Sequence, residues 1–249
     1  VTASRTEKNA GTYATTASGT DGNYNLSFVD GSMVINKVPL AVRVNDDAKF
    51  VTQSDAAGYA GVSYSGFVAG ETATVLGGAL AIGRSASGPD GNTSAANSAV
   101  GSYTGALTAS GLTSPNYTLS YQSGNYRIIP ADQLLIKLAN ASTTYGQAAS
   151  YSVTEAKYLN QSNTIVDLTG SVTSSVSNGT TSFAVSDGVG GSARFAVSAS
   201  GAVLSGAGQL SAGSYQLDAT GVSVSSNNFS KLCRSEERRV GKECLRLCR

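Results

Sequence analysis

The chain has 249 residues, 29 of them Gly and 12 of them Tyr, and it contains neither His nor Trp. Only 13% of the residues are charged, but regularly spaced Val, Ile and Tyr argue against disorder, because disordered chains usually lack β-branched and aromatic residues. Without His, the chain has no Ser-His-Asp or Cys-His nucleophile pair and no His-based metal centre. The composition therefore favours an all-β protein of many short strands and polar turns.

The net charge of +1 conceals a difference between the body of the chain and its C-terminal stretch. Seven of the 17 Lys and Arg and three of the 16 Asp and Glu lie between Lys231 and Arg249, so residues 1–230 carry 10 basic and 13 acidic side chains. A mildly acidic, Cys-free body is not expected to form disulfides or to bind nucleic acid. No apolar run approaches the roughly 20 residues of a membrane span.

The first predicted elements are two runs of alternating apolar residues that flank Asp30-Gly31. Leu26 and Phe28 lie in the first run, and Met33 and Ile35 lie in the second. Because Gly accepts the positive φ that tight hairpin turns need, this pattern predicts a β-hairpin.

The next predicted strand carries Leu40, Val42 and Val44 on one face, with Arg43 pointing outward. Pro39 precedes these residues, which fits a boundary between repeats because Pro cannot donate to a central ladder.

These elements return further along the chain. Residues 23–35 recur at 116–128 with an offset of 93, which predicts a second hairpin around Ser123-Gly124, and residues 40–44 recur at 134–138 with an offset of 94. A Gly-Ser/Thr-Tyr triplet occurs three times, as Gly11-Thr-Tyr13, Gly101-Ser-Tyr103 and Gly213-Ser-Tyr215. Several separated blocks in one order indicate tandem repeats.

The last copy is longer than the one before it. Asn116-Tyr117 returns as Asn228-Phe229 at an offset of 112, which exceeds the preceding offset by 18 residues. We place the extra length between Ser171 and Ser200, where two alternating runs flank Asp187-Gly-Val-Gly-Gly191 and predict an added hairpin.

The repeat pattern stops after Leu232, where a turn and a final strand are expected. From Cys233 to Arg249 the composition changes to Arg, Glu and Cys, and the stretch resembles translated vector or adapter sequence. Its three Cys form no Cys-x-x-Cys pair, so a structural zinc site lacks its usual ligands. Since Val1 opens in polar sequence without the pattern of a secretory signal, we expect both ends to be cut from a longer protein.

The repeats divide the chain into four predicted parts. The expected fold is a rod of tandem small β-domains, each an Ig-like sandwich or a β-grasp-like unit, with a single helical turn within Phe67–Leu76. The four parts are 1–38 (the end of a preceding repeat), 39–131 (a complete repeat), 132–232 (a longer repeat lacking its last strand) and 233–249 (a non-native tail).

No group of residues points to chemistry. Four carboxylates, Asp46, Asp47, Asp55 and Glu71, lie in polar, turn-like segments and are expected to be solvated loop residues. Asp187-Gly188 and Asp90-Gly91-Asn92 contain oxygen ligands suited to Ca²⁺ but neither forms a complete calcium loop, so we interpret both as turns. We therefore predict no catalytic residues, no cofactor-binding residues, no metal site and no enzyme activity.

Aromatic residues recur at equivalent repeat positions. Tyr13, Tyr103 and Tyr215 form one set, and Tyr24, Tyr117 and Phe229 form another, which indicates packing inside each repeat, since a single binding site would not be duplicated. Five further tyrosines are expected to cover a core or a sheet edge, with an exposed binding face as the alternative: Tyr59, Tyr64, Tyr145, Tyr151 and Tyr158.

The Leu/Ile-rich first strand, Thr144-Tyr-Gly-Gln147, the Gly-Ser/Thr-Tyr start and the Asn-Tyr-x-Leu-Ser-Tyr/Phe…Gly ending resemble MBG/YDG-type repeats of filamentous haemagglutinin-like secreted adhesins. The resemblance covers residues 11–232, although Phe50-Val-Thr-Gln53 stands where Tyr-Gly-Gln is expected. It implies a large exoprotein on the outer face of a Gram-negative cell, exported by two-partner secretion through an outer-membrane transporter.

The resulting hypothesis is a structural stalk segment that spaces an adhesive region from the cell, with neighbouring repeats of the same chain as its partners. One alternative is a module that binds host or biofilm surface glycans, for example through Tyr59 or Tyr64. The other is an accessory region of a secreted polysaccharide-active enzyme. No nucleic-acid partner is expected.

Overall fold

The computed structural model describes residues 9–84, 99–177, 180–206, 208–213 and 215–234. Regular structure in this part is almost entirely β-strand, and the two exceptions are single 3₁₀ turns, η1 (Ala73–Val75) and η2 (Thr169–Ser171). The all-β class is confirmed, and η1 is the helical turn predicted within Phe67–Leu76. Among the described residues, no helix has the length and apolar character needed to cross a membrane.

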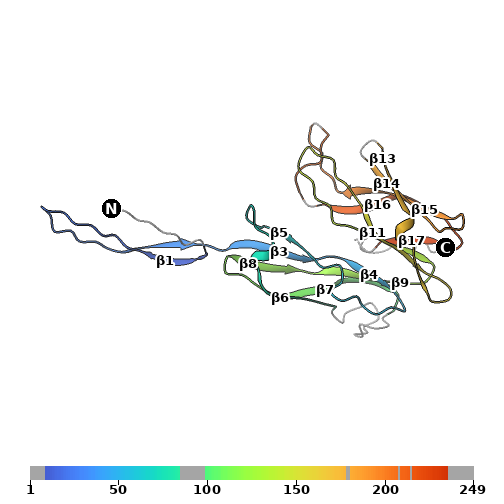
Figure 1. Cartoon of the computed structure of the whole chain (residues 1–249), viewed down its shortest axis with the longest axis horizontal. Coiled ribbons are helices and arrows are strands. Elements are labelled where there is room, and N and C mark those ends of the chain that lie inside the picture. The colour runs from blue at the N-terminus through green and yellow to red at the C-terminus, as the bar shows by residue number, and fades with distance from the viewer. Residues whose placement is uncertain (1–8, 85–98, 178–179, 207, 214, 235–249) are drawn as a thin grey trace. The chain divides into compact units, whose positions relative to one another are not determined.

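The chain divides into two compact units, each built from separate segments of the sequence, and Figure 1 labels strands along the whole chain. Unit 1 comprises residues 1–44, 61–83 and 108–123, and unit 2 comprises residues 45–60, 84–107 and 124–249. These units do not follow the boundaries of the sequence repeats, because residues 39–131 contribute to both. The division at 38/39 and 131/132 therefore stays a prediction about repeats.

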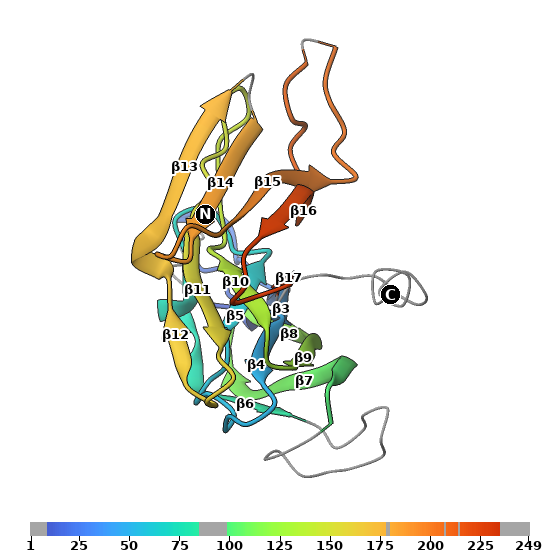
Figure 2. The same cartoon turned by 90° about the vertical axis from the view of Figure 1, so that its right-hand side faces the viewer.

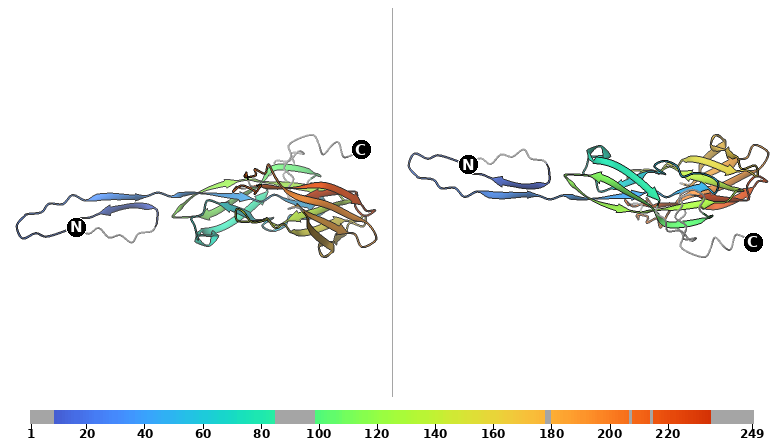
Figure 3. Two further views of the ribbon diagram at one scale, coloured as in Figure 1. Left: turned by 90° about the horizontal axis from the view of Figure 1, so that it is seen from above. Right: turned by 90° about the horizontal axis from the view of Figure 1, so that it is seen from below.

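Unit 1 begins with a two-stranded antiparallel ribbon of β1 (Gly11–Thr15) and β2 (Gly31–Ile35), joined by the long loop 16–30 (Figure 3). Leu26 and Phe28 lie in this loop and not in a strand. The hairpin predicted around Asp30-Gly31 is therefore wrong, because β2 pairs with the more distant β1.

The central strand of unit 1 is β3 (Val38–Val44), which pairs antiparallel with β5 (Val62–Ser65) and parallel with β8 (Tyr117–Gln122). The predicted alternation along β3 is confirmed by three fully buried side chains that bracket the half-buried Arg43: Leu40, Val42 and Val44. Pro39 lies inside β3, one residue from its start, where its missing N–H interrupts little of the ladder.

The hairpin predicted around Ser123-Gly124 is also wrong. The strand before this turn, β8, has β3 as its ladder partner, whereas the strand after it, β9 (Gly124–Ile129), belongs to another sheet. That four-stranded sheet has the order β4-β9-β7-β6, with β4 (Asp47–Phe50), β6 (Gly77–Arg84) and β7 (Gly101–Thr113). Alternation located these strands correctly but assigned the wrong partners.

Residues 132–234 of unit 2 form a two-layer sandwich (Figure 2). One layer has the order β12-β11-β10-β17 and the other β13-β14-β15-β16. Their bounds are β10 (Gln133–Leu138), β11 (Val153–Leu159), β12 (Ile165–Asp167), β13 (Val172–Ser177), β14 (Thr180–Ser186), β15 (Ser192–Ser200), β16 (Gln216–Ser225) and β17 (Lys231–Arg234). Both layers bury apolar side chains in one core, with Leu134, Ile136 and Tyr158 from the first and Phe183, Phe195 and Val197 from the second.

The repeats share strand pairing as well as sequence. β10 lies between antiparallel β11 and parallel β17, as β3 lies between antiparallel β5 and parallel β8. The β7–β9 pairing has Gly101 opposite Ile128 and Tyr103 opposite Tyr126. The β1–β2 pairing repeats this register at the equivalent residues, with Gly11 opposite Ile35 and Tyr13 opposite Met33.

The added hairpin of the last copy is confirmed: β14 and β15 pair antiparallel with Ser186 opposite Ser192. These two strands lie between β13 and β16 in the sheet. Asp187 fixes the turn, because its Oδ1 accepts hydrogen bonds from the backbone N–H groups of Val189 (3.0 Å) and Gly191 (2.7 Å). Its Oδ2 accepts a 2.6 Å hydrogen bond from Ser226, which ties the turn to the end of β16.

The predicted tail lies largely outside the described residues. β17 ends at Arg234, so the strand continues for two residues beyond the predicted boundary at Leu232. The final strand expected after it and residues 235–249 fall in the part that the structure does not describe.

Candidate functional site: the junction between two repeats

A small apolar cluster lies in unit 2, where β9 of one predicted repeat is followed by β10 of the next. Buried apolar side chains from four strands meet there, namely Ala48, Phe50, Ile129, Leu135 and Leu159. Since residues of both predicted repeats share this small core, the junction is a packed contact and not a bare linker.

Leu135 reaches this junction because β10 is buried on both faces. Its neighbours Leu134 and Ile136 point into the sandwich core, whereas Leu135, on the opposite face, is only 3% exposed. Sequence reasoning predicted a half-buried strand here and missed the second face. The available signal was the uninterrupted run Leu134-Leu135-Ile136, where the equivalent strand has the small Ala41 at its centre.

The short connection between β9 and β10 is fixed by hydrogen bonds. The Asp132 N–H donates to the Leu159 carbonyl (3.2 Å), and the Asp132 carbonyl accepts from the Ser230 N–H (2.9 Å). The Ser230 hydroxyl also donates to the Asp132 carboxylate at 3.1 Å. Asp132 adopts φ of 68°, a conformation that Asp tolerates better than most residues. These bonds hold the connection against β11 and the start of β17.

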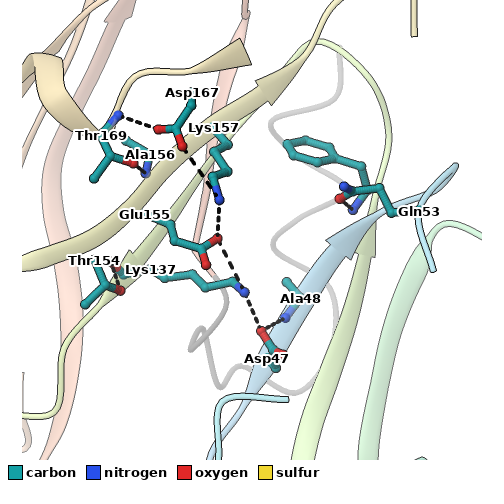
Figure 4. A network of polar contacts seen from close by, with 11 residues as sticks. Asp47, Ala48, Gln53, Lys137, Thr154, Glu155, Ala156, Lys157, Asp167 and Thr169 are labelled. Atoms are coloured by element: carbon teal, nitrogen blue, oxygen red, sulfur yellow. Dashed lines mark hydrogen bonds and ion pairs between the residues drawn. The ribbon is translucent and has the colours of Figure 1, made fainter. Parts of the chain in front are cut away.

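A chain of alternating charges crosses the same junction (Figure 4). Lys137 Nζ lies 2.8 Å from Asp47 Oδ1 and 3.6 Å from Glu155 Oε2. Lys157 Nζ continues the chain, 3.5 Å from Glu155 Oε2 and 3.8 Å from Asp167 Oδ2. Only the Asp47–Lys137 pair combines hydrogen-bonding distance with burial, because the Asp47 side chain is 2% exposed. Of these four ion pairs, Asp47–Lys137 is therefore expected to contribute most to the stability of the junction.

The far end of this chain is anchored in the backbone. The Thr169 N–H donates to Asp167 Oδ1 at 2.8 Å, and the Ala156 N–H donates to the Thr169 hydroxyl at 3.0 Å. The hydrogen bonds from Thr169, with the nearby Lys157, lower the pKa of Asp167 below its ordinary value. Asp167 therefore stays ionised and can attract Lys157.

A second polar cluster lies within unit 2 around Asp55. Its carboxylate contacts Lys49 Nζ (2.7 Å) and Arg84 Nε (2.9 Å) and accepts hydrogen bonds from the hydroxyls of Tyr59 (2.9 Å) and Tyr126 (3.2 Å). The Lys49 and Arg84 side chains are each 4% exposed. The Arg84 guanidinium also lies 5.0 Å from the centre of the Tyr126 ring, within cation–π range.

The pKa values in this cluster follow from burial and from these contacts. Burial alone would raise the pKa of Asp55, but the hydrogen bonds from Lys49, Arg84 and Tyr59 hold it below its usual value. Burial and the hydrogen bond to Asp55 raise the pKa of Tyr59 to about 12. Burial, followed by the nearby charges of Asp55 and Asp47, also raises the pKa of Tyr126. At neutral pH the cluster is therefore an ionised carboxylate held by cations and neutral phenols.

The carboxylates singled out from the sequence are mostly not solvated. Asp47 is a buried ion-pair partner, Asp55 is a partly buried one, and Asp46 accepts two hydrogen bonds from Asn125, at 2.7 and 3.0 Å. The expectation of solvated loop residues is therefore wrong for these three and holds only for the exposed Glu71, which accepts a hydrogen bond from Tyr117. The polar residues Asn45, Asp46 and Asp47 have the composition of a turn, but β4 already begins at Asp47.

One of the two turns predicted from Asp-Gly pairs, Asp187-Gly188, lies within the described residues. The interpretation of Asp187-Gly188 as a turn is supported by the hydrogen bonds that occupy the Asp187 carboxylate, and those from Ser226 and Val189 lower its pKa. Asp90-Gly91-Asn92 lies outside the described residues. Within the part that the structure covers, no three His, Cys, Asp or Glu side chains gather in a way that would hold a metal ion.

The first recurrent aromatic set has one shared contact. The hydroxyls of Tyr13, Tyr103 and Tyr215 each donate to the backbone carbonyl four residues upstream, at 2.8, 2.5 and 2.8 Å. Of the second set, Tyr117 and Phe229 are buried, whereas Tyr24 is 74% exposed. Packing inside the repeat is thus confirmed for Tyr103, Tyr117 and Phe229, whereas Tyr13 and Tyr215 are half-buried and Tyr24 is exposed.

The five remaining tyrosines mostly cover a core. Tyr158 is buried, Tyr151 packs against the sandwich core, Tyr59 meets the Tyr126 ring edge-on and Tyr64 lies 5.5 Å from Phe67 between ring centres. Only Tyr145 among the five is mostly exposed. The turn that contains Tyr145 has a hydrogen bond from the Gln147 N–H to the Thr144 carbonyl, and the Gln53 N–H donates equivalently to the Phe50 carbonyl. The same turn therefore forms with and without the Tyr-Gly pair.

Shared strand order, shared register and a recurring tyrosine contact define a β-rich repeat protein. Residues 40–127 match the family model of the MBG domain (YGX type), so this segment is an MBG-type β-rich repeat, as the sequence motifs indicated. Comparisons with curated proteins and with solved structures found no match.

Proposed function

We propose that this chain is a stretch of structural stalk in a large secreted bacterial adhesin, with its repeats spacing an adhesive region from the cell surface. The observation that carries the proposal is the packed junction between successive repeats, formed by Phe50, Ile129 and Leu135 and by the Asp47–Lys137 pair. A spacer must transmit force and resist bending, and neighbour-to-neighbour burial is how tandem repeats achieve this. The recurrence of side chains at equivalent positions also favours a scaffold over a unique reaction site.

The stalk role also implies which molecules the chain contacts and where it is located. Neighbouring repeats are the direct partners, an outer-membrane transporter is the partner during export, and the outer face of a Gram-negative cell is the destination. No enzyme activity is assigned to these repeats. The glycan-binding alternative gains no support from Tyr59 or Tyr64, because both rings already pack against other aromatic rings.

Immunogold labelling of the producing bacterium, with antibodies raised against the full chain, tests the proposal. A stalk predicts label outside the outer membrane that disappears when intact cells are treated with a protease. Label confined to the cell interior would contradict it. A glycan array probed with the same chain provides the second arm, because specific binding would favour the recognition hypothesis instead.

A further inference from the structure

The loop between β1 and β2 carries the same motif as a paired strand elsewhere in the chain. Residues 23–28 read Asn-Tyr-Asn-Leu-Ser-Phe, and residues 116–121 read Asn-Tyr-Thr-Leu-Ser-Tyr. The second copy contains β8, which pairs in parallel along β3, whereas the first copy is in no strand.

The apolar side chains of the motif are more buried in the copy that pairs with β3 than in the copy that has no strand partner. Tyr117, opposite Val38 in the β3–β8 ladder, is 3% exposed, while its equivalent Tyr24 is 74% exposed. Leu119 is half-buried opposite Leu40, and its equivalent Leu26 is exposed. The third pair, Phe28 and Tyr121, is exposed to a similar extent in both copies, so it lies at the rim of the contact in either case.

The structure next to this loop resembles that of a complete repeat. β1 and β2 pair at Gly11 and Tyr13 in the register that β7 and β9 have at Gly101 and Tyr103, and the loop 16–30 leads into β2 as the connection through β8 leads into β9. Residues 23–28 therefore have neither the parallel strand partner nor the apolar side-chain contacts that β3 provides for β8.

We propose that residues 23–28 are a docking site for the first strand of an MBG-type repeat, an extended segment of the type Val38–Val44. The strand would add in parallel, with the equivalents of Val38, Leu40 and Val42 opposite Tyr24, Leu26 and Phe28, as β3 meets β8. Main-chain hydrogen bonds provide affinity in such strand addition, and the alternate apolar side chains provide specificity. This inference stands independently of the stalk role.

Fluorescence polarisation with a labelled peptide of residues 37–44 tests the site on the full chain. We expect saturable binding, and we expect Leu26→Ser combined with Tyr24→Ser to weaken it by at least about tenfold, because both side chains would lose their apolar cover. Val29→Ser is the matched control, since Val29 is exposed in the same loop but lies outside the motif. Hydrogen exchange should show new protection at residues 23–28 when the peptide is bound.

Three results would overturn the proposal. The first is no binding above that of a peptide in which Leu40 and Val42 are replaced by Asp. The second is binding that the double variant leaves unchanged. The third is self-association of the full chain that the double variant abolishes while the peptide itself does not bind, which would make a second copy the occupant of this surface.

Discussion

At the scale of single residues, three tyrosine hydroxyls show how a repeat position acquires one structural role. Tyr13, Tyr103 and Tyr215 each close a loop onto the carbonyl four residues upstream. A Tyr near a strand start that bonds back to the preceding backbone fixes how the chain enters the sheet. The sequence predicted that these residues pack inside the repeat, but it could not reveal the carbonyl partner, because a backbone atom carries no sequence signal.

We expect Tyr103→Phe and Tyr215→Phe each to lower the free energy of unfolding by about 1 kcal/mol, the net worth of one hydrogen bond. Urea unfolding of the full chain, followed by circular dichroism, measures this. Tyr145→Phe is the control, because that side chain is exposed and its loss should leave the midpoint unchanged. Equal effects for all three variants would show that the upstream carbonyl contact contributes nothing.

The buried charge cluster predicts how stability depends on acid. The pKa of Asp55 is lower in the folded chain than its unfolded value of about 3.9, so its contribution to stability is complete above about pH 5 and is lost as the pH falls through the folded pKa. We expect Asp55→Asn to cost about 3–5 kcal/mol at pH 7, because Lys49 and Arg84 lose the carboxylate they contact.

Melting temperatures measured from pH 7 to pH 2 check this expectation. The stability difference between the wild type and Asp55→Asn should be constant above about pH 5 and should shrink as the solution becomes more acidic. A difference that grows in acid would mean that Asp55 is not held ionised by its neighbours.

At the scale of elements, the strands were easier to predict than their partners. The alternation of Leu40, Val42 and Val44 predicted β3, and the runs flanking Asp187 predicted β14 and β15. Both hairpins predicted around Asp-Gly and Ser-Gly were wrong, because alternation specifies which residues face a core and not which strand lies alongside. The parallel β3–β8 ladder joins segments that begin at Val38 and Tyr117, and no local pattern encodes such a distant pairing.

The junction gives a prediction for β10. We expect Leu135→Ala to destabilise unit 2 by about 2–5 kcal/mol, because Leu135 is buried against Phe50, Ile129 and Leu159 although it lies on the face that alternation would make polar. Thermal unfolding compares it with Leu204→Ala, an exposed control. A loss at Leu135 no larger than at Leu204 would mean that the two repeats are not packed together at this point.

At the scale of the whole molecule, the repeat was predictable because its motifs recur several times along the sequence. Offsets of 93 and 94 residues identified it, and the structure adds that equivalent segments have equivalent strand partners. The junction was not predictable to the same degree, since it depends on Asp47, Leu135 and Lys137 meeting from distant positions. Single residues that meet only in the fold leave no periodic pattern.

Matched cysteine pairs test most directly whether the chain is one β repeat copied along its length. In a background with Cys233, Cys244 and Cys248 replaced by Ser, one variant carries Thr12→Cys with Val34→Cys, and another carries Ser102→Cys with Arg127→Cys. These are opposite residues at equivalent positions of the β1–β2 and β7–β9 ladders. We predict that mild oxidation forms an intramolecular disulfide in both variants, and not when the second Cys is moved by one residue to position 35 or 128. A disulfide in only one of the two variants, or equal yields in and out of register, would contradict the repeat.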